Sequence, residues 1–330
     1  KIKLPIKKMK TSLQLAGIVA FLIIQFFGEA TAQNSTNSTN TTSNYTYDAF
    51  GYVTPSQYSY TTGGAEWTTA FANCGLQMQS PIDIGSVTGT CDSSMVFNLQ
   101  LVNNITFNLT NSSSGIQGTG NFGQLYATDV NGILTGYTAN LFKIHSPSEH
   151  SLQGQFYDAE FQLYFDIMPS FTPTGNRTKA AISFMLSTNS NTTSNTSSVL
   201  TPFGIGTNQT NATLNFSDTL QGAIPLSDAG TILYYTYQGS LTQPPCNETV
   251  NWFIISGALP ISQTDLIYMN SLWVANATFA AGHGNNRAEQ LLNARTIKQG
   301  GVACEEQFVY FFSFFILYIF INYFIFKLLQ

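Results

Sequence analysis

Several residues of this sequence that could carry chemistry lie between positions 143 and 162. Its 3 histidines are His145, His150 and His283. Lys143 precedes His145 by two residues, so the two side chains project from the same face if the segment is a β-strand. Glu149 and Glu160 supply carboxylates nearby, and Gln162 follows Glu160.

Short strands are the elements predicted to position these residues. Apolar runs of strand length alternate with Gly, Asn, Ser and Pro turns. The predicted strands are residues 95–102, 105–109, 141–145, 160–167, 180–186, 232–237 and 250–256. Helical patterns are few, and residues 189–198 read as a polar surface loop. The pattern predicts a mainly β (α+β) domain, without an internal repeat, a phosphate-binding loop or a nucleophile elbow.

The start of the sequence predicts export. Residues 9–32 read as a signal peptide, with Lys10 before an apolar run and Ala30-Thr31-Ala32 as a cleavage site. Residues 1–8 read as an upstream or non-native start, because Met9 stands where a signal peptide would begin. Residues 33–57 are rich in Asn, Thr and Ser, which predicts a disordered, glycosylated segment.

The end of the sequence predicts a membrane anchor. Residues 308–326 carry no charge and consist largely of Phe, Tyr, Ile and Leu. They predict either a transmembrane helix with Lys327 as a cytoplasmic stop, or a tail that directs a lipid anchor to small residues near Gly300. Residues 299–307 would be a juxtamembrane spacer and 327–330 a short tail. Both alternatives place the domain outside the cell, after passage through the secretory pathway.

Glycosylation motifs and acidic charge support a surface location. Asn-X-Ser/Thr acceptors occur at Asn34, Asn37, Asn40, Asn44, Asn104, Asn108, Asn111, Asn176, Asn191, Asn195, Asn208, Asn211, Asn215, Asn247 and Asn276. Residues 33–307 hold 6 basic and 16 acidic residues, a net charge of −10. This charge argues against nucleic acid as a partner, and no basic patch suited to a sulfated polysaccharide is evident.

Five segments resemble alpha-type carbonic anhydrases, in the order that the family has them. Residues 58–67 resemble the entry segment, and residues 74–84 resemble the Gln-Ser-Pro-Ile-Asp-Ile signature. Residues 145–150 match the His-Ser-Pro-Ser-Glu-His stretch of secreted members. Residues 235–246 and 285–295 match the later segments. The resemblance spans residues 58–298 and implies a single domain with a twisted, mostly antiparallel central sheet and a cleft floored by strands.

The resemblance also implies a damaged metal site. In that family three histidines hold zinc, which lowers the pKa of a bound water to about 7. Here the three ligand positions read Lys143, His145 and Gln162, so the chain resembles a zinc-ligand-deficient, carbonic anhydrase-related member. Residues 111–117, in the place of the proton-shuttling histidine, contain none. We expect no catalytic residue, no metal and no other cofactor, unless zinc binds through substituted ligands.

Other family positions are retained. Thr242 and Glu149 match the pair that orients zinc-bound hydroxide, and Glu160 matches the carboxylate behind the third ligand. These vestigial residues either tie the sheet together or support residual catalysis. The expected pocket residues are Leu241, Val250, Trp252, Gln243 and Gln117.

Lys143 has a predicted role of its own. Glu149 and Glu160 would be costly buried charges in a site without a divalent cation. We therefore expect the Lys143 ammonium to fill the place of zinc and to hydrogen-bond toward Gln162, Thr242 or a carboxylate. The alternative is a lysine that extends into solvent.

Four cysteines in an exported chain suggest two disulfides. The resemblance pairs Cys74 with Cys246, whose positions are bridged in secreted members. Cys91 and Cys304 either pair, clamping the C-terminal segment to the domain, or remain free or bind another chain.

Three functions stay open. The first is a catalytically inactive, membrane-anchored surface glycoprotein that acts in binding, adhesion or surface assembly, with an unknown surface protein or glycan as partner. The second is an active enzyme with a substituted metal site, which hydrates carbon dioxide or hydrolyses esters with Thr242, Glu149 and His145. The third is a structural coat or filament component.

Overall fold

The computed structural model describes residues 45–85, 92, 94–112, 115–189, 198–205, 210–227 and 230–301. The strands are β1 (Asp83–Ile84), β2 (Phe97–Leu101), β3 (Ile105–Ser112), β4 (Gly115–Thr128), β5 (Leu134–His145), β6 (Ser151–Leu152), β7 (Ala159–Ile167), β8 (Lys179–Ser187), β9 (Asn211–Leu214), β10 (Tyr234–Gly239), β11 (Val250–Pro260) and β12 (Lys298–Gly300). The helices are α2 (Trp67–Ala70), α3 (Phe216–Leu220) and α4 (Gln263–Ala275), with 3-10 turns η2 (Pro55–Gln57), η3 (Ala72–Gly75), η4 (Thr201–Phe203) and η5 (Gln221–Ala223).

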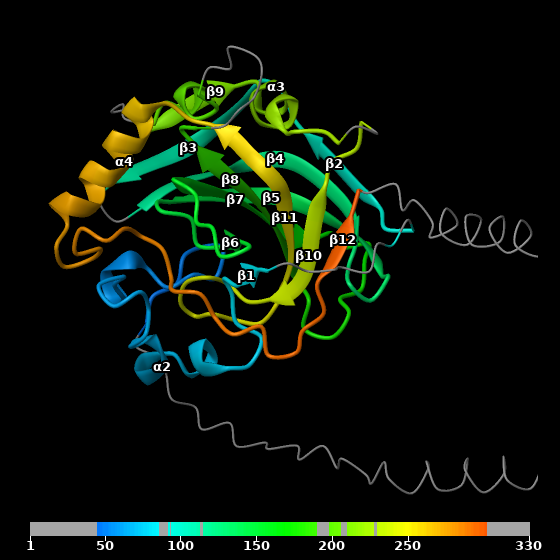
Figure 1. The fold of residues 1–330 in the computed structure, drawn as a ribbon, viewed down its shortest axis with the longest axis horizontal. Helices are drawn as coiled ribbons and strands as arrows, with labels where there is room; N and C mark the ends of the chain where they lie inside the picture. Colours follow the sequence, from blue (N-terminus) through cyan, green and yellow to red (C-terminus); the bar gives the residue numbers. More distant parts are fainter. Residues whose placement is uncertain are drawn as a thin grey trace, which may run out of the picture. The chain divides into compact units, whose positions relative to one another are not determined.

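A mixed sheet of ten strands forms the centre of the described chain (Figure 1). Its order is β12-β10-β11-β8-β7-β5-β4-β3-β9, and β2 pairs with β4 outside this path. Neighbouring strands are antiparallel except β8 and β11, which are parallel, and β1 and β6 form a separate parallel pair. The predicted mainly β, mostly antiparallel single domain is confirmed.

All seven predicted strands are present, but the longest strand, β4, was missed. Glycine is unfavourable inside a strand, yet two glycines of β4 are required because atoms of neighbouring strands approach them closely. A Cβ atom at Gly118 would lie 2.1 Å from the Phe142 ring. Gly123 has φ +129°, and a Cβ there would lie 2.1 Å from the Gln100 carbonyl.

The sheet has two apolar faces because side chains alternate along each strand. One face packs Phe142 and Phe161, with ring centroids 4.8 Å apart, beneath Phe203 and Phe216 of η4 and α3. The opposite face carries a smaller core that includes Leu141, Tyr164 and Trp252. In the register of β5 and β7, Leu141 pairs with Tyr164 and Lys143 with Gln162, so the candidate site lies on this second face.

The prediction of disorder for residues 33–57 is wrong for residues 45–57. They were assigned to a disordered segment, but they fold against the domain. Asp48 Oδ1 accepts hydrogen bonds from the N–H groups of Phe50 and Tyr52, and Val53 N–H donates to the Pro244 carbonyl. Tyr52 and Val53 are each 1% exposed. Burial of these two side chains stabilises a segment whose overall composition indicated disorder.

Several predictions fall on residues outside the described ranges. These are the start and signal peptide, residues 33–44, the sequons at Asn191, Asn195 and Asn208, the anchor at 308–326 with residues 302–307 and 327–330, and Cys91 and Cys304. None of the helices in the described ranges is both long and apolar enough to cross a membrane.

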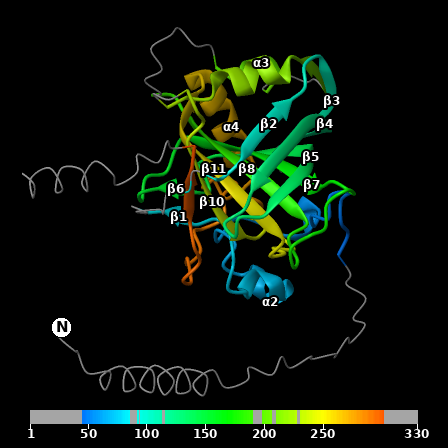
Figure 2. The same cartoon turned by 90° about the vertical axis from the view of Figure 1, so that its right-hand side faces the viewer.

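The disulfide between Cys74 and Cys246 is present, with Cα atoms 4.9 Å apart. In both views α2 lies at the opposite end of the domain from α3 (Figures 1 and 2).

Candidate functional site

The three family ligand positions lie together on two neighbouring strands. Lys143 and His145 belong to β5, and Gln162 belongs to β7, where it pairs in register with Lys143. Lys143 is 8% exposed, His145 2% and Gln162 0%. The strands thus bring the predicted residues together, but at this point they form part of the protein interior.

The Gln162 side chain connects two buried carboxylates. Its Nε2 donates to Glu149 Oε2 at 2.9 Å and to Glu160 Oε1 at 2.8 Å. Its Oε1 accepts from the Tyr164 hydroxyl at 2.5 Å and from the Thr242 hydroxyl at 3.4 Å. An ionised carboxylate can only accept, so the amide nitrogen must face the two glutamates. The amide oxygen points away from them and is already occupied.

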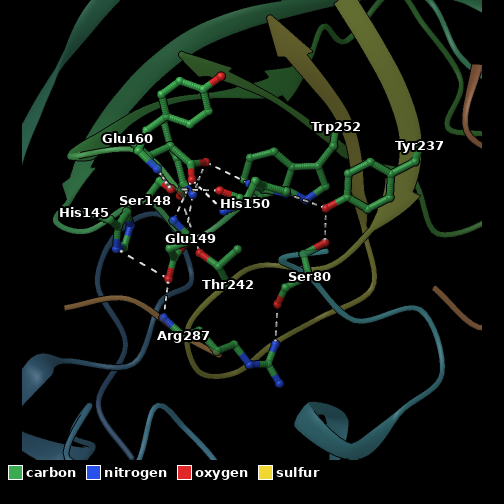
Figure 3. Close-up of polar contacts among 12 residues, drawn as sticks. Ser80, His145, Ser148, Glu149, His150, Glu160, Tyr237, Thr242, Trp252 and Arg287 are labelled. Carbon is green, nitrogen blue, oxygen red and sulfur yellow. Dashed lines mark hydrogen bonds and ion pairs between the residues drawn. The ribbon is translucent and has the colours of Figure 1, made fainter. Parts of the chain in front are cut away.

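The surroundings of Glu160 favour its charged form. Burial by itself would raise the pKa of Glu160, but the His150 imidazole and the hydrogen bonds from His150 and Gln162 outweigh burial and lower that pKa to about 2. The backbone N–H groups of Glu149 and His150 both donate to Glu160 Oε2 at 2.8 Å. Glu160 therefore remains an anion that holds the turn after β5 in place (Figure 3).

Glu149 accepts hydrogen bonds from the Gln162 amide and the Arg287 backbone, and its charge is less well compensated than that of Glu160. It accepts from Gln162 and from the Arg287 backbone N–H at 2.8 Å, and its Oε1 lies 3.5 Å from His145 Nδ1. Burial raises the pKa of Glu149, and the charge of Glu160 adds to this effect. The amide of Gln162 is the group that lets two fully buried carboxylates lie side by side.

His150 is part of a structural chain of hydrogen bonds. Its Nδ1 lies 2.8 Å from Glu160 Oε1, and its Nε2 lies 2.7 Å from the Tyr237 hydroxyl. Tyr237 in turn donates to Ser80 Oγ at 2.8 Å (Figure 3). Both ring nitrogens are occupied, so His150 is committed to joining β7, β10 and the segment before β1. His283, by contrast, is exposed.

His145 offers one free nitrogen. Its Nδ1 lies 2.6 Å from the Asn285 carbonyl, which can only accept, so Nδ1 carries the proton of the neutral ring. Its Nε2 is buried and has no hydrogen-bond partner among the described residues. Among the three ligand positions, this Nε2 lone pair is the one donor that remains available to a metal ion.

The predicted hydrogen bond from the Lys143 ammonium is not the contact that the structure shows. The ammonium is buried, as expected, but it lies over the Tyr52 ring, with Nζ 4.0 Å from the ring centroid. Among the described residues it forms no hydrogen bond with Gln162, Thr242 or a carboxylate. Burial lowers the pKa of Lys143 to about 8, although the charges of Asp48 and Glu149 act in the opposite direction. The electron-rich face of a tyrosine, and not a carboxylate, is its partner.

Tyr52 is the site residue that sequence reasoning missed. Its ring packs edge-on to Tyr164 at 5.6 Å between centroids, and its hydroxyl is buried without a partner among the described residues. It reaches this place because the segment from Tyr47 to Val53 forms a β-bridge closed by Asp48. The only sequence signal was an aromatic residue in a polar segment, between Asp48 and the first family-like residues. The Tyr52 ring, which belongs to the N-terminal part of the domain, thus covers the Lys143 ammonium.

The predicted pocket residues lie around this group. Leu241, Val250 and Trp252 belong to the same core cluster as Tyr52. Gln243 is 3% exposed and its Oε1 accepts from the Tyr58 hydroxyl at 2.8 Å. Gln117 of β4 is half-buried and pairs in register with Lys143. Four of the five are thus buried, three of them in packed apolar core.

These residues do not fit zinc. A zinc site in a protein needs three or four N, S or O donors that can be brought to one point. Here Gln162 turns its nitrogen to the carboxylates, Lys143 presents a cation, and only His145 Nε2 is available. Among the described residues, no group of three or more His, Cys, Asp or Glu side chains could hold a metal ion elsewhere.

The family assignment follows from the fold, the disulfide and this arrangement together. Residues 62–300 match the model of the eukaryotic-type carbonic anhydrases. The chain therefore belongs to the carbonic anhydrase family.

Known proteins agree with this assignment. Human carbonic anhydrase 12 is 26% identical over 226 residues, which make up 63% of this chain and 61% of that protein. Dioscorin DB3S of Dioscorea polystachya is 26% identical over 236 residues, covering 70% of this chain and 78% of the dioscorin. The alpha-carbonic anhydrase structure from Photobacterium profundum superposes with a TM-score of 0.52 at 26% identity, covering 73% of this chain and 99% of that one. The chain spans less than two thirds of the length of human carbonic anhydrase 12.

Proposed function

We propose that this chain is a carbonic anhydrase-related protein without zinc and without hydration activity, whose folded domain serves as an exported binding head. Its partner is a surface protein or a glycan, and its role lies in adhesion or surface assembly. The single observation that carries the proposal is the double hydrogen bond from the Gln162 amide to Glu149 and Glu160.

This hydrogen-bond pattern supports a fold that is complete without metal. Buried carboxylates are expensive unless each has donors or a cation. In this chain Glu149 and Glu160 have side-chain and backbone donors already, and the carboxylates need no zinc-bound group nearby. The scaffold can therefore keep Glu149, Glu160 and Thr242 for stability alone.

Tyr52 supports the same proposal from another direction. A hydration site must admit carbon dioxide and water to the reacting atom. Lys143, His145 and Tyr52 expose between 1% and 8% of their surface, and the Tyr52 ring covers the Lys143 ammonium. Two independent features, the ligand set and the cover, thus argue against catalysis.

Export and anchoring rest on the sequence. The predicted signal peptide, the sequons, the disulfide and the apolar C-terminal segment support a secretory route that ends at the cell surface. The acidic character of residues 33–307 argues against nucleic acid as the partner. The anchor is either a transmembrane helix or a lipid.

Metal analysis combined with a carbon dioxide hydration assay tests the proposal. The purified exported chain should contain far less than one zinc per molecule and should not accelerate hydration above the buffer rate. Adding zinc to the assay controls for metal lost during purification. Stoichiometric zinc together with rapid hydration would replace this proposal with the enzyme alternative.

A further inference from the structure

The outer end of the sheet carries an uncharged ladder of asparagine and threonine. On β3 the exposed residues are Thr106, Asn108 and Thr110, and on β9 they are Asn211 and Thr213. The strands pair antiparallel, with Asn108 opposite Asn211 and Thr106 opposite Thr213. The two threonine hydroxyls lie 2.8 Å apart, within hydrogen-bond distance. Alternate residues of both strands therefore form one continuous polar surface.

The ladder is built from glycosylation motifs. Five sequons begin in these two strands or at their ends; the asparagines of four, Asn104, Asn108, Asn211 and Asn215, are exposed, and that of the fifth, Asn111, is half-buried. The Asn104 backbone N–H donates to Asn215 Oδ1 at 3.2 Å, which leaves the Asn215 amide nitrogen free of this bond. Sequons that are far apart in the sequence are thus brought into register by the fold.

The ladder stands at one edge of the sheet. Among the strands of the described ranges β9 is the last on its side, and its four residues carry no charge. Proteins protect such edges with charges, proline, bulges or a covering segment, because unpaired backbone groups invite a strand from another molecule. Charge and proline are absent from β9, so another form of protection is needed there.

The ladder lies on the same sheet face as the candidate site. Register runs from Leu141 of β5 through Thr119 of β4 to Asn108 of β3 and Asn211 of β9. Opposed residues point to the same face, and neighbouring strands are spaced by about 4.8 Å, so Asn211 stands about 14 Å from Leu141 across the sheet. A bulky group on the ladder would flank the face that carries Lys143 and Tyr52.

We propose that this ladder is a clustered N-glycan platform that shields the β9 edge and the adjoining site face. The inference rests on the proposed export and specifies where the exported domain is modified. In each transfer, the asparagine Nδ2 attacks the anomeric carbon of an oligosaccharide carried on a lipid diphosphate. The new C–N bond forms as the C–O bond to the diphosphate breaks; the amide loses one proton and the lipid diphosphate leaves.

Site-specific glycopeptide mass spectrometry on the full chain, expressed in eukaryotic cells and purified from their surface membrane, tests the platform. Enzymatic release of the glycans in heavy-oxygen water marks each occupied asparagine. We expect occupancy on both strands, at Asn104 or Asn108 and at Asn211 or Asn215. The exposed sequon at Asn176 and the half-buried one at Asn276 serve as internal references for passage through the secretory pathway.

The references separate the two possible failures. Occupied Asn176 or Asn276 with bare β3 and β9 would overturn the platform and leave the proposed export intact. Bare asparagines at all of these positions, in a chain that never reaches the cell surface, would overturn both.

A paired variant tests the shielding. Asn108→Gln with Asn211→Gln removes the opposed pair and keeps the polar surface, whereas Asn176→Gln with Asn276→Gln removes two sequons away from the ladder. Sedimentation velocity should show a larger oligomeric fraction for the first pair than for the second. Equal monomer fractions in both variants, with the ladder sites occupied in the parent, would contradict the shielding role.

Discussion

Replacing Lys143 with methionine should stabilise the folded chain, although it removes a buried cation from the candidate site. Burial lowers the pKa of this ammonium from 10.5 to about 8. A shift of this size means that holding the charge in the folded state costs about 3 kcal/mol at neutral pH. The contact with Tyr52 offsets about 1 kcal/mol of this cost. Methionine fills a similar volume, so Lys143→Met should gain about 2 kcal/mol at pH 7.

The stability difference between Lys143→Met and the parent should change with pH in a defined direction. Below pH 8 the amine is protonated in both the folded and the unfolded chain, and the full cost applies. Between pH 8 and 10.5 the folded chain releases the proton first, so its stability relative to Lys143→Met rises with pH. The advantage of the variant should therefore shrink across this window.

Urea unfolding of parent and variant at several pH values between 7 and 10.5 measures the effect. The matched control is Lys298→Met, which removes a lysine that forms an ion pair with Asp92 near the surface. The control should change stability by less than about 1 kcal/mol and should lack the pH-dependent difference. A Lys143→Met chain that is less stable than the parent at pH 7 would refute the reasoning. It would mean that the ammonium makes a net favourable interaction which burial does not cancel.

Three further predictions follow from the hydrogen bonds. Gln162→Leu removes the two hydrogen bonds that the Gln162 amide donates to the buried carboxylates and should cost about 4 kcal/mol in urea unfolding, whereas Gln155→Leu, at an exposed position, should be nearly neutral. Because the pKa of Glu160 is lowered from 4.5 to about 2, its charge stabilises the fold above pH 4.5, and about 3 kcal/mol should be lost as pH falls from 4.5 to 2. The free energy of unfolding of Glu160→Gln should not show this loss between pH 4.5 and 2. If the stability of the variant falls as steeply with acid as that of the parent, Glu160 is not the group responsible. Lys143→His with Gln162→His should bind zinc in calorimetry, but hydration should appear only when Tyr52→Ala is added; activity of the double variant alone would mean that Tyr52 does not cover the site.

The strands of the candidate site could be predicted because their sequences alternate and carry family motifs. The segments around Lys143 and Gln162 matched in order and spacing, and their register follows from ordinary antiparallel pairing. β4 could not be predicted, because its glycines serve contacts with Phe142 and Gln100 that appear only when the strands are packed.

The partners of the site residues were harder to predict than the residues themselves. Charge arithmetic suggested that Lys143 would pair with a carboxylate. The structure instead satisfies Glu149 and Glu160 with the Gln162 amide, a neutral group that sequence reasoning treated only as a weak ligand. Tyr52 escaped notice because the composition around it indicated disorder, whereas the burial of Tyr52 and Val53 holds the segment against the domain.

Zinc titration of the metal-free chain, followed by calorimetry, tests the central claim most directly. The parent should show no saturable heat of binding, and Lys143→His with Gln162→His should serve as the positive control that binds one zinc. A parent chain that binds one zinc, and loses this binding in His145→Ala, would contradict the claim that a lone imidazole is all that remains of the metal site.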